Sequence, residues 1–223
     1  METEGAVGFD IPRNWTFKTA DIASGFDRHV REQLPWYDLT TGVVSHVARH
    51  YIPDGGLVYD IGCSTGNIGK AIAGTLEDRG ARLVGVDNSE AMRAKYEGPG
   101  EFVCAQAEKF DYQSFDVAIL FLSLMFVPVD KRRDLMDKLR CRCRKGGVIV
   151  VFDRCNPTGG YPSLVLSRLT LAGKIASGVP ANEVLAKEIS LIGVQRPIDP
   201  KVLGEHAVEV FRFGDFAGWL IEG

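Results

Sequence analysis

A glycine-bearing segment that follows an acidic residue is the part of the sequence best suited to chemistry. Asp60 lies near the end of an apolar run, and Gly62, Gly66 and Gly69 follow it. Glycine lacks a Cβ atom, so a ligand can approach its backbone where any other residue would clash. The spacing G-x-x-x-G-x-x-G differs from the G-x-G-x-x-G of dinucleotide-binding sites. A tight turn that serves only packing is therefore the alternative interpretation of these glycines.

A second acid ends the next apolar run of the chain. Asp87 closes residues 83–87 and is followed by Asn88 and Ser89. A carboxylate at that place can accept hydrogen bonds from both hydroxyls of a ribose, so the two acids together fit an adenosine ligand. Helix capping is the alternative, because Asp, Asn and Ser all cap helices and a helix is expected next.

A polar turn follows the short apolar run 102–104 and carries Gln106 and Ala107. The amide oxygen of Gln106 can accept a hydrogen bond from the exocyclic amine of a base, and a backbone N–H of the turn can reach a ring nitrogen. A surface glutamine without a ligand is the alternative.

The elements that position these residues alternate between strands and helices. Continuous apolar runs without alternation are typical of parallel strands that are covered on both faces. The alternation predicts an α/β fold with a doubly wound, Rossmann-like sheet. Strands are predicted at 57–61, 83–87, 102–104, 117–121, 148–152, 208–211 and 216–221, with a turn at 145–147. Helices are predicted within 15–51 on either side of Pro35, and at 68–76, 89–96, 130–140, 164–175 and 181–192.

Residues 1–223 are predicted to form a single domain, because no linker or repeat divides them. Four parts are expected within it: a loose N-terminus at 1–14, an N-terminal helical cap at 15–52, a ligand-binding core at 55–153, and a helical insertion with closing strands at 154–223.

Composition and charge exclude several classes of protein. The net charge of −3 disfavours a general nucleic-acid coat, although the basic run 131–145 keeps nucleic-acid contact as an alternative to a solvated helix face. The longest apolar stretch, 117–129, is shorter than the roughly 20 residues that span a bilayer, so no membrane partner is expected. Five cysteines at irregular spacing favour reduced thiols in the cytoplasm, and no metal-ligand spacing is present.

The ordered motifs resemble a class I S-adenosylmethionine-dependent methyltransferase. The likeness covers about residues 55–153 and consists of Asp60-x-Gly62 with Gly66, Asp87 at a strand end, and the Lys145-Gly146-Gly147 turn. Within that superfamily the sequence most resembles the carboxy-S-adenosylmethionine synthase family. The segments that carry this likeness are WTF at 15–17, PWY at 35–37, VYDIGCSxG at 58–66, VDNSxAM at 86–92 and FxFG at 211–214, where x is any residue.

The resemblance implies a mostly parallel seven-stranded sheet with an antiparallel last strand, and S-adenosyl-L-methionine as the cofactor, with carboxy-S-adenosyl-L-methionine as the alternative. It implies that Tyr37 closes over the cofactor and that Asp87 and Asn88 meet the ribose and adenine. It places Asp60, Gly62, Cys63 and Ser64 at the amino-acid end. The cofactor-binding set is completed by Gly66, Gln106, Ala107 and Phe121.

Three positions depart from the family pattern, which has an acid near Gln106, an asparagine near Phe121 and an arginine near Glu188. Because Glu188 would repel a cofactor carboxylate, we expect plain S-adenosylmethionine and methyl transfer to a small molecule or a nucleobase. If the alignment shifts by one residue, Lys187 stands there and the positive charge is kept. An enzyme that makes or uses carboxy-S-adenosylmethionine is the first alternative.

A non-catalytic S-adenosylmethionine-binding protein is the second alternative, and Phe121 in place of a polar residue supports it. A homodimer is also left open. The sequence identifies no catalytic residue. A sulfonium is already an activated electrophile, so positioning supplies much of the rate and a base is needed only when the acceptor must lose a proton. Asp153 and His29 are the candidates for that base, with a capping acid and a surface imidazole as their alternatives.

Overall fold

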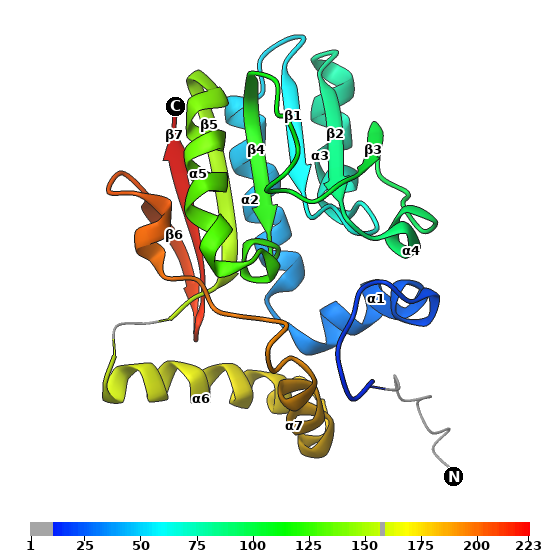
Figure 1. Cartoon of the computed structure of the whole chain (residues 1–223), viewed down its shortest axis with the longest axis vertical. Helices are drawn as coiled ribbons and strands as arrows, with labels where there is room; N and C mark the ends of the chain where they lie inside the picture. Colours follow the sequence, from blue (N-terminus) through cyan, green and yellow to red (C-terminus); the bar gives the residue numbers. More distant parts are fainter. Residues whose placement is uncertain (1–10, 157–158) are drawn as a thin grey trace.

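A seven-stranded mixed sheet forms the centre of the protein in the computed structural model, which describes residues 11–156 and 159–223 (Figure 1). The strand order is β3-β2-β1-β4-β5-β7-β6, and only β7 runs antiparallel to its neighbours. This is the doubly wound, mostly parallel sheet that the sequence predicts. The strands are β1 (Leu57–Ile61), β2 (Arg82–Asp87), β3 (Glu101–Cys104), β4 (Phe115–Phe121), β5 (Cys143–Arg154), β6 (Val208–Phe213) and β7 (Phe216–Glu222).

Helices cover both faces of the sheet, which explains the continuous apolar runs. Successive residues of β1 enter different cores: Val58 packs with Val44 and Ile72 on one face, and Tyr59 packs with Leu135 on the other. The α-helices are α1 (Ala20–Gln33), α2 (Tyr37–Tyr51), α3 (Asn67–Asp78), α4 (Glu90–Arg93), α5 (Val129–Arg142), α6 (Tyr161–Ala176) and α7 (Ala181–Ser190), and η1 (Leu124–Phe126) and η2 (Pro200–Leu203) are 3-10 helices.

The turn predicted at 145–147 is wrong, because β5 begins before it. Phe115 of β4 pairs with Cys143, and Val117 then pairs with Val148, so a single β4 residue faces four residues of β5. This bulge is possible because Gly146 adopts a positive φ of 81°. Asp116 stabilises it by accepting a hydrogen bond from the Arg144 guanidinium at 2.6 Å.

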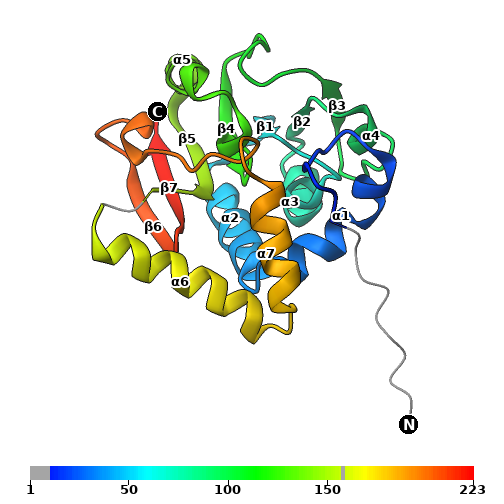
Figure 2. The ribbon, with the colours of Figure 1, turned by 60° about the horizontal axis from the view of Figure 1, so that its bottom comes forward.

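Helices α1, α6 and α7 lie beyond the carboxyl ends of the parallel strands (Figures 1 and 2). The helix predicted from residue 15 begins only at Ala20, since Trp15 instead donates its backbone N–H to the carbonyl of Ser190 at 2.9 Å. The side chain of Gln33 donates to Glu183 at 3.1 Å. These contacts join α1 and the segment before it to α7. Helix α2 follows α1 in the chain and packs directly on one face of the sheet.

The basic run on α5 and the start of β5 is largely engaged within the protein. Arg132 is buried and donates to four backbone carbonyls, and Lys138 donates to the carbonyls of Glu108 and Phe110. Arg144 pairs with Asp116. These contacts support a structural role for the run. In the described part of the chain, no helix has the length and apolar character needed to cross a membrane.

Candidate active site

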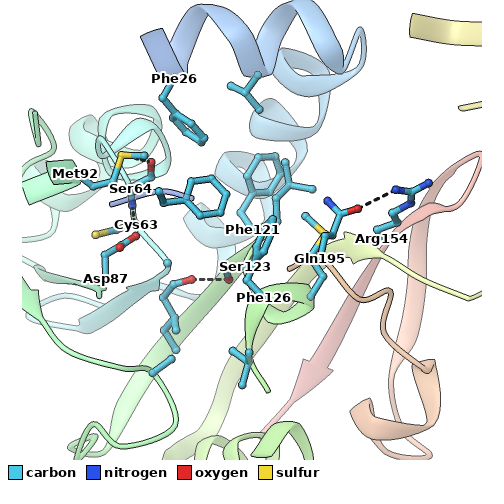
Figure 3. A pocket seen from close by; sticks show the side chains of 18 of the residues that line it. Phe26, Cys63, Ser64, Asp87, Met92, Phe121, Ser123, Phe126, Arg154 and Gln195 are labelled. Carbon is cyan, nitrogen blue, oxygen red and sulfur yellow. Dashed lines mark hydrogen bonds between the residues drawn. The ribbon is translucent and has the colours of Figure 1, made fainter. Parts of the chain in front are cut away.

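A cavity of about 360 Å³ lies where the carboxyl ends of β1, β2 and β4 meet α1 and α7. Figure 3 shows its two sides: Cys63, Ser64 and Asp87 lie on one, Arg154 and Gln195 on the other, and Phe121 between them. The cavity is placed at the edge of the sheet where ligands bind in doubly wound folds. All the residues predicted for the cofactor line it except Gly66.

Asp60 supplies a buried carboxylate without a complete set of partners. Its side chain is 1% exposed, and no described residue hydrogen-bonds to Oδ2. Burial, together with the charge of Asp87, raises the pKa of Asp60 to about 7. An unsatisfied acceptor in a cavity costs free energy that a donor or cation on a ligand can offset. Asp60 is therefore suited to bind an ammonium group.

Asp87 is held by the backbone on both sides of its carboxylate. Oδ2 accepts from the N–H of Ser64 at 2.9 Å, and Oδ1 accepts from the N–H of Ser89 at 3.0 Å. Burial raises the pKa of Asp87. Each carboxylate oxygen has a further lone pair available, so the fixed group can still accept hydrogen bonds from a diol.

The two glycines of the loop are required by the protein's own packing. Gly62 has φ +78°, and a Cβ there would overlap the Cβ of Ser123. Gly66 has φ +91° as the N-cap of α3, and a Cβ there would overlap the backbone of Gly98. Both glycines therefore meet a steric requirement inside the fold, and the close approach of a ligand to them stays a prediction.

The remaining predicted residues form the walls of the cavity. Tyr37 contacts the ring of Phe121 edge to face, with the ring centroids 5.4 Å apart. Burial raises the pKa of Tyr37 to about 12, so its hydroxyl is protonated at neutral pH. Cys63, Asn88, Gln106 and Ala107 also line the cavity.

An aromatic chamber occupies the end of the cavity beneath α1 and α7. Phe17 contacts Trp15, Phe26 and Phe126 through edge-to-face ring pairs. His29 stacks on Trp15 with the ring centroids 5.3 Å apart. Such a wall excludes water and favours planar or apolar groups.

Charged residues from the helical insertion complete this end. The Glu188 carboxylate receives Arg154 at 3.0 Å and Lys174 at 2.9 Å, and Arg154 also pairs with Asp215 at 2.8 Å. Burial alone would raise the pKa of Glu188, but the charges and hydrogen bonds of Lys174 and Arg154 together outweigh it and lower the pKa, so Glu188 is neutralised by its ion pairs. The expectation that Glu188 would repel a carboxylate is therefore wrong.

Lys187 is a further amine in the cavity. Its Nζ lies over the ring of Trp15, and the side chain is buried. Burial, and secondly the nearby Lys174, lowers the pKa of Lys187 to about 5. A pKa near 5 leaves the amine neutral at physiological pH, and an anion beside it would favour protonation.

The two candidate bases have different surroundings. His29 lines the cavity and is 3% exposed, so the surface imidazole is excluded. Burial and neighbouring cations lower the pKa of His29 to about 3, which leaves a neutral ring. Asp153 does not line the cavity, and it accepts from the backbone N–H groups of Met125 and Arg154 at 3.1 and 3.0 Å. Asp153 is a structural residue.

Several lining residues were missed by the sequence analysis. Arg154 ends β5, so the rule that found the other strand-end residues also applies to it. Lys174 lines the cavity from α6, where it shares the buried helix face with Thr170, a residue that does not line the cavity. Polar residues spaced on one face of a predicted helix could have indicated that this face lines a site. Phe26, Phe126, Leu191 and Gln195 gave no such signal.

The fold and the cavity define the class of the protein. Residues 59–151 match the family model described as a methyltransferase domain. A plantazolicin methyltransferase, solved with a substrate analogue and SAH, is 16% identical with a TM-score of 0.60 over 90% of this chain and 88% of that one. The magnesium protoporphyrin IX methyltransferase of Synechocystis is 19% identical with a TM-score of 0.55 over 88% and 93%. The chain is an S-adenosylmethionine-dependent transferase with the Rossmann-like methyltransferase fold.

Curated relatives narrow the likeness within that class. The carboxy-S-adenosyl-L-methionine synthase of Staphylococcus epidermidis is 25% identical over 214 residues, which cover 94% of this chain and 93% of that protein. The synthase of Shewanella loihica is 26% identical over 208 residues, which cover 89% and 85%. These matches confirm the resemblance seen in the sequence motifs.

Proposed function

We propose that the protein binds S-adenosylmethionine and transfers its methyl group to a small molecule. The observation that carries this proposal is the single cavity that joins Asp60 and Asp87 to the aromatic chamber. A small molecule is favoured over a nucleobase in a polymer, because α1, α7 and the segment at Trp15 are tied together over the chamber. A free nucleobase also fits this description.

The residues present fit the cofactor. The unsatisfied Oδ2 of Asp60 would bind the ammonium of its amino-acid end, and Asp87 would accept from the ribose hydroxyls. Gln106 and Ala107 would face the base. When bound, the cofactor supplies a methyl group on an activated sulfonium.

The chain itself contributes positioning and exclusion of water. The aromatic chamber would hold the acceptor in line with the sulfonium methyl group and would exclude water. Such positioning accounts for much of the rate in transfers of this kind. His29 lines that chamber, but a pKa near 3 makes its imidazole a weak proton acceptor, so an acceptor that need not lose a proton before the transfer fits the site best.

Binding and turnover are tested separately. Calorimetric titration of the full chain with S-adenosylmethionine should show one site per chain, and Asp60→Asn should weaken it by removing the charge that faces the ammonium. An acceptor panel assayed for release of S-adenosylhomocysteine should then reveal a methylated product. Binding without turnover on any acceptor would favour the non-catalytic alternative, and the absence of binding would overturn the proposal.

A second candidate function has its own support. Lys187 lines the chamber, and Arg154 and Lys174 neutralise Glu188, so a carboxylate beyond the sulfonium would meet a cation. The relatives named above are carboxy-S-adenosyl-L-methionine synthases. An enzyme that makes or uses the carboxylated cofactor is therefore the alternative.

Competition between the two cofactors decides between the candidates. Preference for the carboxylated form, reduced by Lys187→Met, would support the alternative. Preference for the plain form, unchanged in Lys187→Met, would support methyl transfer.

A further inference from the structure

A series of side-chain hydrogen bonds joins α1 to the loop between β1 and α3. Oδ1 of Asp27 accepts from the Thr65 hydroxyl at 2.5 Å and from Nδ2 of Asn67 at 2.8 Å. Nδ2 of Asn67 also donates to the hydroxyl oxygen of Tyr37 at 3.2 Å. Tyr37 and Asn67 line the cavity, and Asp27 of α1 reaches Tyr37 through Asn67.

These bonds have a fixed direction. Oδ1 of Asp27 accepts from both Thr65 and Asn67, so Asn67 presents its NH2 group to Asp27 rather than its amide oxygen. The two N–H bonds of that group are then directed at Asp27 and Tyr37. Because the Tyr37 oxygen accepts from Asn67, its own proton must point elsewhere, and no described residue accepts it. That proton is available to a ligand in the cavity.

We propose that Asp27 and Asn67 are positioning residues that make Tyr37 a hydrogen-bond donor toward the bound cofactor. The inference rests on the proposed function, which supplies the ligand. Tyr37 and Asp60 line the same cavity, one with a donor to offer and one with an unsatisfied acceptor. This pair suits a ligand that carries both a carboxylate and an ammonium.

The ring of Tyr37 is held independently of this series. The Arg31 guanidinium lies 5.2 Å from the ring centroid, and Arg31 is itself anchored by donating to the backbone carbonyl of Asp27 at 2.9 Å. Phe121 packs edge to face on the same ring. A change at Asn67 should therefore redirect the hydroxyl proton without displacing the ring.

The variant Asn67→Asp tests the direction with a side chain of the same shape. It also sets a second carboxylate against Asp27, so the variant should be less stable than wild type. The new carboxylate accepts the Tyr37 proton, so the donor is lost from the cavity. We expect affinity for S-adenosylmethionine to fall about tenfold or more, and Tyr37→Phe to cause a similar loss. The double variant should bind no more weakly than the weaker single variant. Asn182→Asp, on the exposed face of α7, is the matched control and should leave affinity unchanged.

Exchanging the side chains of residues 27 and 67 separates their effect on the Tyr37 hydroxyl from their effect on the stability of the protein. In Asp27→Asn/Asn67→Asp the amide and carboxylate can pair again, so the unfolding temperature should recover relative to Asn67→Asp. The Tyr37 proton would still be drawn to residue 67, so the affinity should stay low. Recovery of affinity together with stability would show a merely structural role and overturn the proposal, as would additive losses in the Asn67 and Tyr37 double variant.

A measurement without cofactor keeps the inference distinct from the proposed function. The 13Cζ NMR signal of Tyr37, assigned with Tyr37→Phe, should shift in ligand-free Asn67→Asp because the hydroxyl changes its hydrogen-bond partner. An unchanged signal would overturn the inference even if the cofactor binds. If the signal shifts but the wild-type protein does not bind S-adenosylmethionine, the proposed function is wrong. The inference that Asp27 and Asn67 direct the Tyr37 hydroxyl proton into the cavity is then still supported.

Discussion

The two ends of the cavity are built in different ways. At the strand end, Asp87 is fixed by backbone N–H groups, and Gly62 is fixed by the close approach of Ser123. At the opposite end, the partners of the Glu188 carboxylate among the described residues are two side chains from separate elements, Arg154 and Lys174. A site held by backbone contacts tolerates few substitutions, because the backbone cannot move without disturbing the sheet. Side chains on the inserted helices can be substituted without that constraint. The difference supports the proposal that the strand end binds the cofactor and that the insertion selects the acceptor.

The largest effect should come from Gly62→Val at the strand end. The left-handed backbone at Gly62 costs a β-branched residue about 1–3 kcal/mol, and the overlap with Ser123 adds to this. We expect loss of cofactor binding together with a marked fall in the free energy of unfolding, measured by urea denaturation and calorimetric titration. The control is Gly74→Val, where nothing lies within 4 Å of an added Cβ. A Gly62→Val protein with unaltered stability would contradict the packing account.

A smaller loss should follow Asp87→Ala. Removing the carboxylate takes away two hydrogen bonds to the ribose, worth about 1.5–3 kcal/mol, or roughly tenfold or more in affinity. Titration with S-adenosylmethionine measures the effect, with Asp54→Ala at an exposed turn as the control. Equal affinity in Asp87→Ala and wild type would remove Asp87 from the site.

The smallest effect should be seen at the opposite end, in Lys187→Met. The lowered pKa of Lys187 means that the unfolded chain binds more protons than the folded one between pH 5 and 10.5, so its contribution to stability increases as the pH rises through that range. Replacing the amine with an apolar side chain removes that slope and should stabilise the protein at pH 6.

Urea denaturation at pH 6 and pH 9 checks this prediction. The gain in Lys187→Met should be greater at pH 6 than at pH 9, and plain S-adenosylmethionine should bind the variant as it binds wild type. A gain that does not depend on pH would show that Lys187 is charged in the folded protein.

The same contrast explains what the sequence could predict. Asp60 and Asp87 end neighbouring parallel strands, so strand order alone brings them together at one edge of the sheet. Lys174 and Lys187 reach the cavity only because the insertion folds back across those strand ends, which no local pattern specifies. The strands were predicted to within a few residues, except for the start of β5.

The error at Glu188 has the same origin. The repulsion expected from Glu188 leaves out the positive charges of Arg154 and Lys174. These residues are separated from Glu188 in the sequence and contact it in the fold. The turn predicted at 145–147 failed for a different reason. A glycine such as Gly146 can adopt a positive φ in a turn or in a β-bulge, so the residue type is the same in both. Only the pairing of β5 with β4 shows that Gly146 lies in a bulge.

A crystal structure of the protein with S-adenosylmethionine tests the central claim most directly. We predict that the ribose will lie on Asp87, the ammonium on Asp60 with the carboxylate near the Tyr37 hydroxyl, and the sulfonium methyl group directed toward the chamber of Trp15, His29 and Lys187. A cofactor bound elsewhere, or bound with its methyl group directed away from that chamber, would contradict the assignment of the two ends.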